Sequence, residues 1–145
     1  MADRYVLDAY ALLALLTDED GSDQVARILE SSESSVSMSA VNVGEVYYML
    51  RRRRGLAAAK QMESAVFQQP NLSIVVPSWE QIRAVADIKF AGGLSFADAF
   101  AAALASELSA VLVTGDAEFA RLERQGIIRI SWVGSNKPPP HRLPF

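Results

Sequence analysis

The sequence predicts an α/β fold in which helices cover both faces of a mainly parallel sheet. Helix-like and strand-like segments alternate from residue 4 to residue 133. Strands that are separated by helices need crossover connections, and such connections give parallel pairing. The 145 residues suit one domain, and no linker or internal repeat divides them. We expect residues 1–134 to form this domain and the proline-rich residues 135–145 to form an irregular tail.

Serine caps and glycine or proline stops delimit the elements of the amino-terminal half. Ser22 or Asp23 can cap the second helix, and Ser39 can cap the third. Gly55 ends the third helix and Pro70 the fourth. The expected elements are a strand at 4–7, a helix at 9–16, a helix that ends near 31, a strand at 34–38, and helices at 40–54 and 56–69.

The same punctuation continues in the carboxyl-terminal half. Pro77 ends a strand, Ser78 and Ser95 cap two helices, and Gly92-Gly93 separates these helices. The expected elements are a strand at 72–76, helices at 79–91 and 96–108, a strand at 110–114, a helix at 117–125, and a strand at 127–133.

Composition narrows the chemistry that the chain can carry. It contains no cysteine, which excludes disulfides, thiolate metal sites and thiol catalysis. Its single histidine, His141, lies in the tail, so we expect neither a Ser-His-Asp triad nor a histidine-rich zinc site. A metal site would use oxygen ligands, which favour Mg²⁺ or Mn²⁺. Ca²⁺ also takes oxygen ligands, but no EF-hand spacing is present.

The net charge of −3 argues against a general nucleic-acid coat protein, but not against an enzyme that acts on nucleic acid. The apolar segment at 5–16 is too short to span a membrane and is interrupted by Asp8. It also lacks a clear signal-peptide cleavage region. We therefore expect a soluble, cytoplasmic protein with no membrane partner.

Four acidic residues stand in or directly after apolar segments, where a carboxylate is costly to bury. They are Asp8 after YVL, Glu45 in VGEVYY, Asp98 in FADAFAAALA and Asp116 after VLVTG. Asp8 and Asp116 follow the carboxyl ends of expected strands, where parallel sheets carry their functional sites. Carboxylates that lie together repel, so they either take up protons or bind a cation. The first hypothesis is therefore a metal-dependent phosphodiester chemistry.

Three of these acids also have a simpler explanation as residues that cap helices. Asp8 and Asp116 can each cap the helix that follows, and Asp98 is the third-position acid of a capping box that begins at Ser95. Taken singly, each position fits capping as well as it fits a site. Asp98 is nevertheless the only charge between residues 94 and 106, and a helix that is apolar nearly all round is usually buried.

Glu45 has no capping role. It lies in the second turn of its helix, one turn from Val41 and one turn from Met49, so its face is partly apolar. Asn42 and Arg52 lie near the same stripe, which leaves an exposed face as the alternative.

Two further residues can support the acids. Thr114, two residues before Asp116, could hold a water molecule or orient a carboxylate, although a β-branched residue also suits the end of a strand. Glu118 lies in the first turn of the last helix, where it interacts favourably with the helix dipole whatever else it does.

Arg51, Arg52, Arg53 and Arg54 form the only dense basic run. Arginines in the last turn of a helix complement its dipole and can simply be solvated. The alternative is a patch that binds RNA phosphates. Arg52 is seven residues after Glu45, about 10 Å along the axis on the same face, a spacing that suits an arginine holding a flanking phosphate.

Most aromatic side chains are expected in the core, because none forms a pattern typical of base stacking. These are Tyr47, Tyr48, Phe67, Trp79, Phe90, Phe96, Phe100 and Phe119. Tyr10, shortly after Asp8, is the ring expected to be exposed near the site.

Four segments together resemble a PIN domain: YVLDAYALLALL, SAVNVGEVYYMLRRR, LSFADAFAAALA and AVLVTGDAEF. The resemblance covers the chain to about Gly134, and the order and spacing of the four segments are specific. Within the superfamily, the chain is most similar to the toxin nucleases of VapBC toxin–antitoxin pairs. The resemblance implies a three-layer α/β/α fold with a five-stranded parallel sheet in the order 3-2-1-4-5. It also places Asp8, Glu45, Asp98 and Asp116 in the family's acidic quartet and Thr114 at its hydroxyl position, and it leaves the role of Glu118 open.

The resemblance further implies a ribonuclease that cleaves tRNA or ribosomal RNA. The quartet would bind Mg²⁺ or Mn²⁺, with Asp8 and Asp116 as central ligands and Asp98 as a further ligand, direct or through water. Glu45 would bind a second ion or position the attacking water. A VapB-type antitoxin would inhibit the enzyme, with the helices at 9–16 and about 24–29 as candidates for its groove, and homodimers are usual in the family.

Other classes of protein remain as alternatives. A non-catalytic interaction module of this fold would tolerate loss of the acids, all of which are present here. A phosphatase of the haloacid dehalogenase type normally needs a second aspartate two residues after the first, and Tyr10 stands there instead. A receiver domain would carry an acidic pair near the first strand and a late lysine, and neither pattern is present.

Overall fold

The computed structural model describes residues 3–134 and confirms the alternation of strands and helices. The elements are, in chain order, β1 (Asp3–Leu7), α1 (Ala9–Leu16), α2 (Ser22–Glu30), β2 (Ser34–Ser39), α3 (Ala40–Arg54), α4 (Leu56–Gln68), β3 (Leu72–Val75), α5 (Trp79–Ala91), α6 (Phe96–Leu108), β4 (Val111–Thr114), a 3₁₀ helix η1 (Ala117–Phe119), α7 (Ala120–Arg124) and β5 (Arg129–Trp132). The expected tail at 135–145 lies outside the described residues, so the domain boundary stays a prediction.

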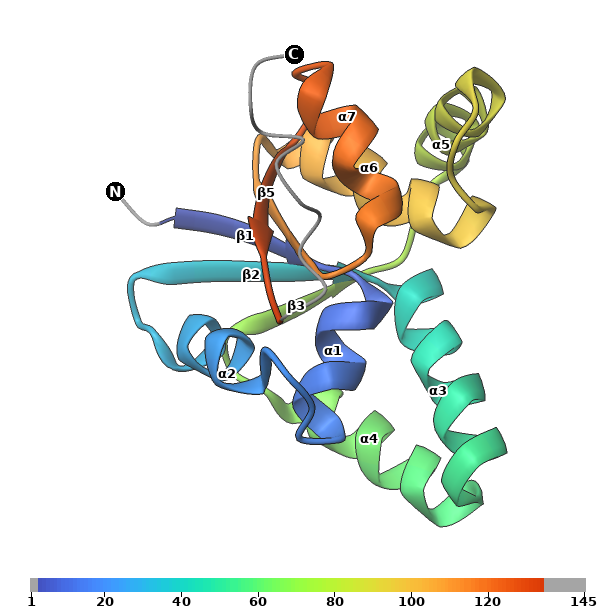
Figure 1. Cartoon of the computed structure of the whole chain (residues 1–145). Helices are drawn as coiled ribbons and strands as arrows, with labels where there is room; N and C mark the ends of the chain where they lie inside the picture. The colour runs from blue at the N-terminus through green and yellow to red at the C-terminus, as the bar shows by residue number, and fades with distance from the viewer. Residues whose placement is uncertain (1–2, 135–145) are drawn as a thin grey trace.

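The five strands form one parallel sheet in the order β3-β2-β1-β4-β5, as expected (Figure 1). β1 and β4 are neighbours, with Val6 paired to Leu112 and Leu7 paired to Val113. The chain runs outward from β1 to β3 on one side and from β4 to β5 on the other, so the strand order reverses between β1 and β4. The carboxyl ends of these two strands therefore border the switch point, where open α/β sheets bind ligands.

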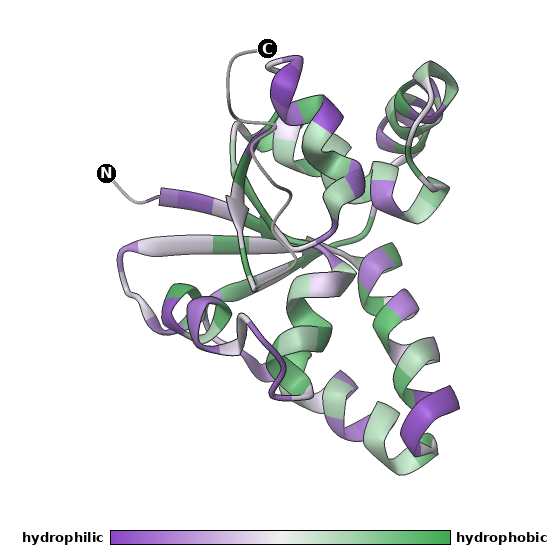
Figure 2. Ribbon diagram, in the orientation of Figure 1, coloured by the Kyte–Doolittle hydropathy of each residue, from purple (hydrophilic) through white to green (hydrophobic). Residues whose placement is uncertain are grey.

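Helices cover both faces of the sheet and give three layers, with α1 to α4 on one side and α5 to α7 on the other (Figure 1). Successive residues of a strand point to opposite faces. Leu7 and Val113 accordingly join the apolar cluster beneath the first four helices, whereas Val6 and Leu112 join the cluster with the last three. All four side chains are fully buried. Figure 2 shows apolar residues along the strands and the helices, whereas the last turn of α3 is strongly hydrophilic.

Most helix starts follow the local rules that the sequence suggested. The Ser39 and Ser95 hydroxyls accept backbone hydrogen bonds and cap α3 and α6. The start of α2 differs, because its N-cap is Gly21, with φ of 96° and no side-chain hydrogen bond. The expected cap by Ser22 or Asp23 is wrong, since the sharp turn at the glycine places both residues inside the helix. The helix expected at 117–125 is divided into η1 and α7.

The expectation that most aromatic side chains lie in the core holds for Phe100 and Phe119 but is wrong for five others. The exposed rings belong to Tyr48 (59%), Phe67 (61%), Trp79 (63%), Phe90 (92%) and Phe96 (48%). For α5 the reason is its position, because the helix buries only Val85 and has no further layer to cover its remaining faces.

Among residues 3–134, no single helix has the length and apolarity needed to cross a membrane. α5 and α6 meet the length and apolarity requirements only when they are taken together, and the angle between these two helices is 115°.

Candidate functional site

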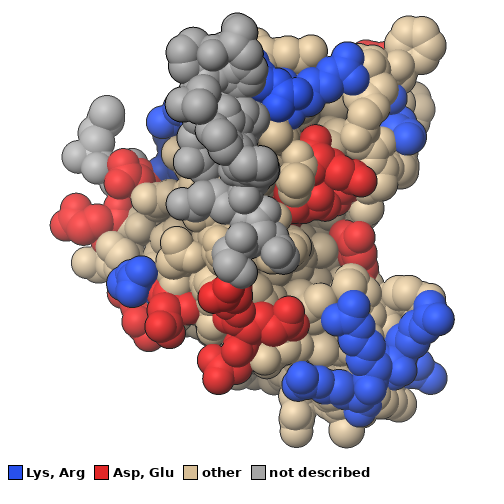
Figure 3. All heavy atoms as spheres, in the orientation of Figure 1, with Lys and Arg blue, Asp and Glu red and all other residues tan. Residues whose placement is uncertain are grey.

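The four acids singled out by the sequence line one pocket beyond the carboxyl ends of β1 and β4. Asp8 directly follows β1 and Asp116 lies shortly after β4, while Glu45 is in the second turn of α3 and Asp98 in the first turn of α6. α3 and α6 pack against each other, which brings the last two acids to the same pocket. Figure 3 shows acidic side chains gathered in the hollow on the right of this face, with a cluster of basic side chains below them.

Asp8 is buried and is held from two sides. It is 2% exposed. Its Oδ1 accepts a hydrogen bond of 2.9 Å from the Ala11 N–H and so caps α1, and its Oδ2 accepts one of 2.5 Å from Thr114 Oγ1. Burial raises the pKa of Asp8 to about 7, although both hydrogen bonds oppose the rise, and the charges of Asp98 and Asp116 add to it. The cap and the pocket carboxyl are therefore the same group.

Thr114 joins the ends of the two central strands. Its side chain is fully buried. Its Oγ1 donates to Asp8 and accepts a hydrogen bond of 3.0 Å from the backbone N–H of Asp116, which one hydroxyl can do at the same time. Thr114 thereby fixes Asp8 relative to the turn that carries Asp116, the kind of orienting contact that the sequence suggested for this residue.

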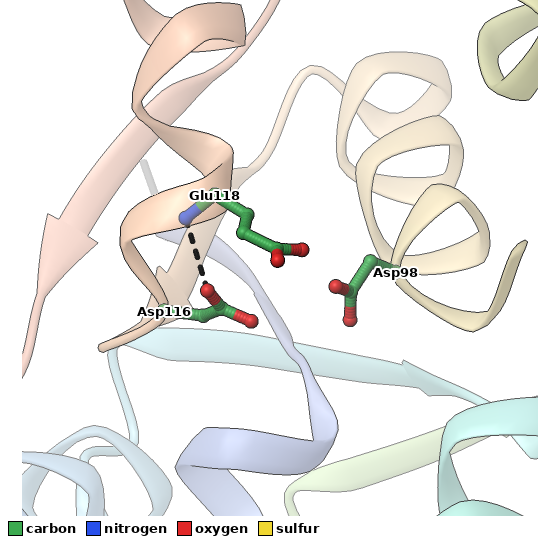
Figure 4. Close-up of side chains that lie close together, drawn as sticks. All are labelled: Asp98, Asp116 and Glu118. Atoms are coloured by element: carbon green, nitrogen blue, oxygen red, sulfur yellow. Dashed lines mark hydrogen bonds between the residues drawn. The ribbon is translucent and has the colours of Figure 1, made fainter. Parts of the chain in front are cut away.

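Asp98, Asp116 and Glu118 form a group of three facing carboxylates (Figure 4). Each contributes one oxygen, and these oxygens lie within 4.8 Å of one another. Asp116 Oδ1 also accepts a hydrogen bond of 2.9 Å from the Glu118 N–H and so caps η1. Burial and, next, the charge of Asp116 raise the pKa of Asp98 to about 6, with smaller contributions from Glu45 and Glu118, while a hydrogen bond with Ser95 opposes the rise.

This donor set fits a hard divalent cation. The ligands on offer are carboxylate oxygens, which Mg²⁺ and Mn²⁺ prefer. Two members of the three-carboxylate group are partly buried and Glu118 is exposed, so the group is open to solvent. Asp98 and Asp116 of this group line the pocket together with Asp8 and Glu45, which do not belong to the group. The geometry thus gives Glu118 a more central place, and Asp8 a deeper one, than the sequence indicated.

Of the four arginines at the end of α3, the structure places Arg53 at the pocket. All four side chains are exposed. Arg52, which the spacing from Glu45 favoured, donates a hydrogen bond of 3.1 Å to the hydroxyl of Tyr48 instead. Arg53 is eight residues after Glu45, or about 12 Å along the helix axis. The pocket therefore extends from the acids toward the positively charged side chain of Arg53.

Asn42 is the residue at this site that sequence reasoning missed. It is fully buried. In the sequence, a polar residue at this position had suggested that this side of α3 could be exposed. Its Nδ2 donates to the carbonyl oxygen of Ala97 at 3.0 Å and to Glu45 Oε1 at 3.4 Å. The available signal was a polar residue one helical turn before Glu45.

Tyr10 lies against the turn that connects Thr114 to Asp116. A Cβ at Gly115 would lie 2.3 Å from Tyr10 Cε1 and 2.8 Å from the carbonyl oxygen of Val133. Both contacts are shorter than real side chains permit, so the turn needs a glycine. The Tyr10 side chain lines the pocket, as expected for a ring near the site, but is partly buried.

Comparison with known proteins gives one family and a consistent set of similar folds. The family model for the PIN domain matches residues 5–125. VapC20 of Mycobacterium tuberculosis, a sarcin–ricin loop cleaving toxin, has a similar structure, with a TM-score of 0.67 and 19% identity over 81% of this chain and 93% of that chain. VapBC2 from Rickettsia felis, bound to a DNA fragment from its promoter, gives a TM-score of 0.68 and 14% identity over 90% and 98% of the two chains. PAE2754 from Pyrobaculum aerophilum gives 0.58 and 27% identity over 83% and 85%. No curated protein sequence matches the chain.

We predict that the metal-free protein loses stability as the pH rises from 5 to 8. The pKa of Asp8 is about 7 in the folded state against an ordinary value of 3.8, so in this range the folded state holds a proton that the unfolded state has released. The free energy of unfolding should therefore fall by roughly 2–3 kcal/mol through Asp8. Asp8→Asn should reduce this slope in urea unfolding at the two pH values and leave the part that comes from Asp98, whose pKa is raised to about 6. The exposed Asp87→Asn is the control, and a D8N protein with the wild-type slope would contradict the prediction.

Gly115→Ala should destabilise the protein by roughly 1–3 kcal/mol, because the new methyl group would displace Tyr10 or the end of β5. Gly44→Ala is the matched control, since nothing lies within 4 Å of a Cβ at that position on α3. It should be neutral or stabilise by up to about 1 kcal/mol, because alanine favours the helix. Denaturant unfolding measures both variants, and equal effects would refute the proposed packing of Tyr10 on this turn.

Proposed function

The chain belongs to the PIN domain family, and on that premise we propose that it is an endoribonuclease that uses a divalent cation to hydrolyse RNA phosphodiester bonds. The observation that carries the proposal is the group formed by Asp98, Asp116 and Glu118 next to the buried Asp8. Burying and clustering carboxylates costs folding free energy, and raised carboxyl pKa values concentrate at functional sites. The group lies at the switch point of the sheet, where this architecture binds ligands.

Mg²⁺ is the cofactor that we propose, with Mn²⁺ as its substitute. Asp98, Asp116 and Glu118 would hold the ion, and Asp8 and Glu45 would complete the acidic wall of the pocket. When bound, such an ion supplies positive charge to the reacting phosphate and lowers the pKa of water.

The protein's own residues would orient the reactants and move the proton. Residues 3–134 contain no histidine, so metal-bound water or a carboxylate would handle the proton of the attacking water, and we assign this step to a carboxylate. Glu45 suits this step, because it lies on α3, outside the three-carboxylate group, and faces the same pocket. Thr114 would keep Asp8 and Asp116 in register during the reaction through its two hydrogen bonds.

Arg51, Arg52, Arg53 and Arg54 would bind phosphates that flank the reacting one. Arg53 has the leading role in this proposal, because it lines the acidic pocket, whereas the other three extend the basic surface seen below the acids in Figure 3. Selection of RNA over DNA would come from shape and contacts to the 2′-hydroxyl. tRNA or ribosomal RNA is the proposed substrate, in line with the sarcin–ricin loop cleavage named for VapC20.

We further propose that the chain is a VapC-type toxin that acts in the cytoplasm and is inhibited by a VapB-type antitoxin protein. Support comes from similar folds found in VapBC complexes, including that of Rickettsia felis. Leu13 and Ala14 of α1 line the pocket, so an inhibitor bound along α1 would also reach the acids. For the expected homodimer, the exposed aromatic side chains Trp79 and Phe90 at the ends of α5 are the surface that we propose.

Purified, antitoxin-free protein should cut a mixture of tRNA and ribosomal RNA into discrete products with Mg²⁺ or Mn²⁺, and EDTA should abolish the cleavage. Asp116→Asn should reduce the rate at least about 100-fold, because it removes a charge from the proposed metal site. Gel electrophoresis of the products with end mapping gives the readout.

Asp87→Asn, an exposed position on α5 that does not line the pocket, is the matched control and should cleave like the wild type. A folded protein that does not bind Mn²⁺ and does not cleave RNA would favour the alternative of a non-catalytic interaction module. Cleavage that persists in EDTA would reject the metal-dependent mechanism.

Arg53→Gln should raise KM for RNA about tenfold with a smaller effect on kcat, because it removes one flanking phosphate contact. The slope of log affinity against log salt concentration should also decrease in magnitude by about 1, the contribution of one phosphate contact. Arg54→Gln is the matched control, since it removes an equal charge one residue away and outside the pocket lining. Equal effects of the two substitutions would show that the run acts as a diffuse patch, contrary to the role given to Arg53.

A further inference from the structure

Asn42 is an amide buried at the junction of the two helices that carry Glu45 and Asp98. It lies in the first turn of α3, one turn before Glu45, and has no exposed surface. A buried primary amide is costly unless its donors and acceptor find partners. Its hydrogen bonds therefore require an explanation in terms of its neighbours.

The orientation of the Asn42 amide is fixed by those neighbours. Nδ2 donates across the helix junction to the Ala97 carbonyl at 3.0 Å and along its own helix to Glu45 Oε1 at 3.4 Å. Both partners are acceptors, so the flipped amide would place its oxygen against two other oxygens. The NH₂ group must therefore face Glu45 and Ala97.

This orientation leaves Asn42 Oδ1 buried without a hydrogen-bond partner among the described residues. An unsatisfied buried oxygen destabilises a fold, and a leucine of similar size would avoid it. Stability alone therefore does not account for an asparagine here. Only the amide can donate two hydrogen bonds at once, one to the Glu45 carboxylate and one to the carbonyl of Ala97, the residue that precedes Asp98.

We propose that Asn42 is a positioning residue of the nuclease site, whose amide sets the place of the Glu45 carboxylate relative to Asp98. The inference rests on the proposed function, because it concerns the same pocket. Through Ala97 the amide holds the first turn of α6, and through Oε1 it holds the side chain of Glu45, which lines the pocket. Hydrogen-bond partners behind metal-site carboxylates typically matter by one to two orders of magnitude in affinity or rate.

The test compares Asn42→Leu with the wild type in two measurements. Mn²⁺ binding, followed by electron paramagnetic resonance without RNA, should weaken about 10-fold or more as the α6 turn loses its anchor. In RNA cleavage, kcat should fall by a similar factor while KM stays the same, since Arg53 and its neighbours are untouched. If Asn42→Leu does not fold, Asn42→Ala removes the same donors without adding bulk.

Two further proteins separate positioning from a general effect on the fold. In a double-mutant cycle at saturating Mn²⁺, which removes the effect of weaker metal binding, Asn42→Leu should have little further effect on kcat in a Glu45→Gln background, because the two residues act as a unit. Asn71→Leu is the matched control: Asn71 also bridges elements by its Nδ2, with its shortest bond of 3.1 Å to the Ser31 carbonyl, but it lies away from the pocket. This control should lower the melting temperature without changing Mn²⁺ affinity.

Wild-type Mn²⁺ affinity and kcat in Asn42→Leu would overturn the inference while leaving the proposed function intact. The same conclusion would follow if the loss of kcat persisted in full beside Glu45→Gln. A wild-type protein that binds no Mn²⁺ and cleaves no RNA would instead reject the proposed function, and this inference with it.

Discussion

The hydrogen-bonded link from Asp8 through Thr114 to the backbone of Asp116 is the interaction on which the site depends. It joins the carboxyl ends of two strands that are far apart in sequence and adjacent in the sheet. An aspartate that is 2% exposed persists only with hydrogen bonds to its oxygens, and here one comes from α1 and the other from β4. The rest of the fold places these donors, because the crossover from β3 back to β4 brings Thr114 beside β1. The apolar clusters on both faces offset what the buried carboxyl costs.

Helix capping and the acidic site are one arrangement rather than competing explanations. Asp8 caps α1 and Asp116 caps η1, while Ser95 caps α6 and leaves Asp98 in its first turn. Backbone N–H groups donate to the Asp8 and Asp116 carboxylates, and the positive end of the helix dipole favours the negative charge of Asp98. The fold thus gathers helix starts at one edge of the sheet and can hold there a density of carboxylates that an arbitrary surface would not tolerate.

How far the sequence could predict this structure depended on whether the signal was local. Strands, helices and the strand order followed from serine caps, glycine stops and the four motifs, and the acids stood out against apolar neighbours. The Gly21 cap escaped because positive φ has no side-chain signature beyond glycine itself. The exposed rings of α5 escaped because burial depends on which layer lies opposite, and that is a tertiary property. The sequence named Arg53 within the basic run but gave more weight to Arg52, because spacing along one helix does not show which arginine the other elements of the pocket face. The role of Asn42 escaped because its partner Ala97 is 55 residues away in sequence.

The charges of the proposed enzyme couple binding of the cation to binding of RNA. A phosphate that enters the pocket meets Asp98 and Asp116, whose oxygens lie within 4.8 Å of each other and of Glu118, and the repulsion of the two partly buried carboxyls is poorly screened. Arg53 also lines the pocket, and its backbone lies about 12 Å along α3 from that of Glu45, which suits contact with a flanking phosphate. In the proposed function, the cation would supply the positive charge at the reacting phosphate, while the arginine run would hold the strand beside it. Since such coupling is reciprocal, bound RNA would tighten the hold of the site on its metal by the same factor.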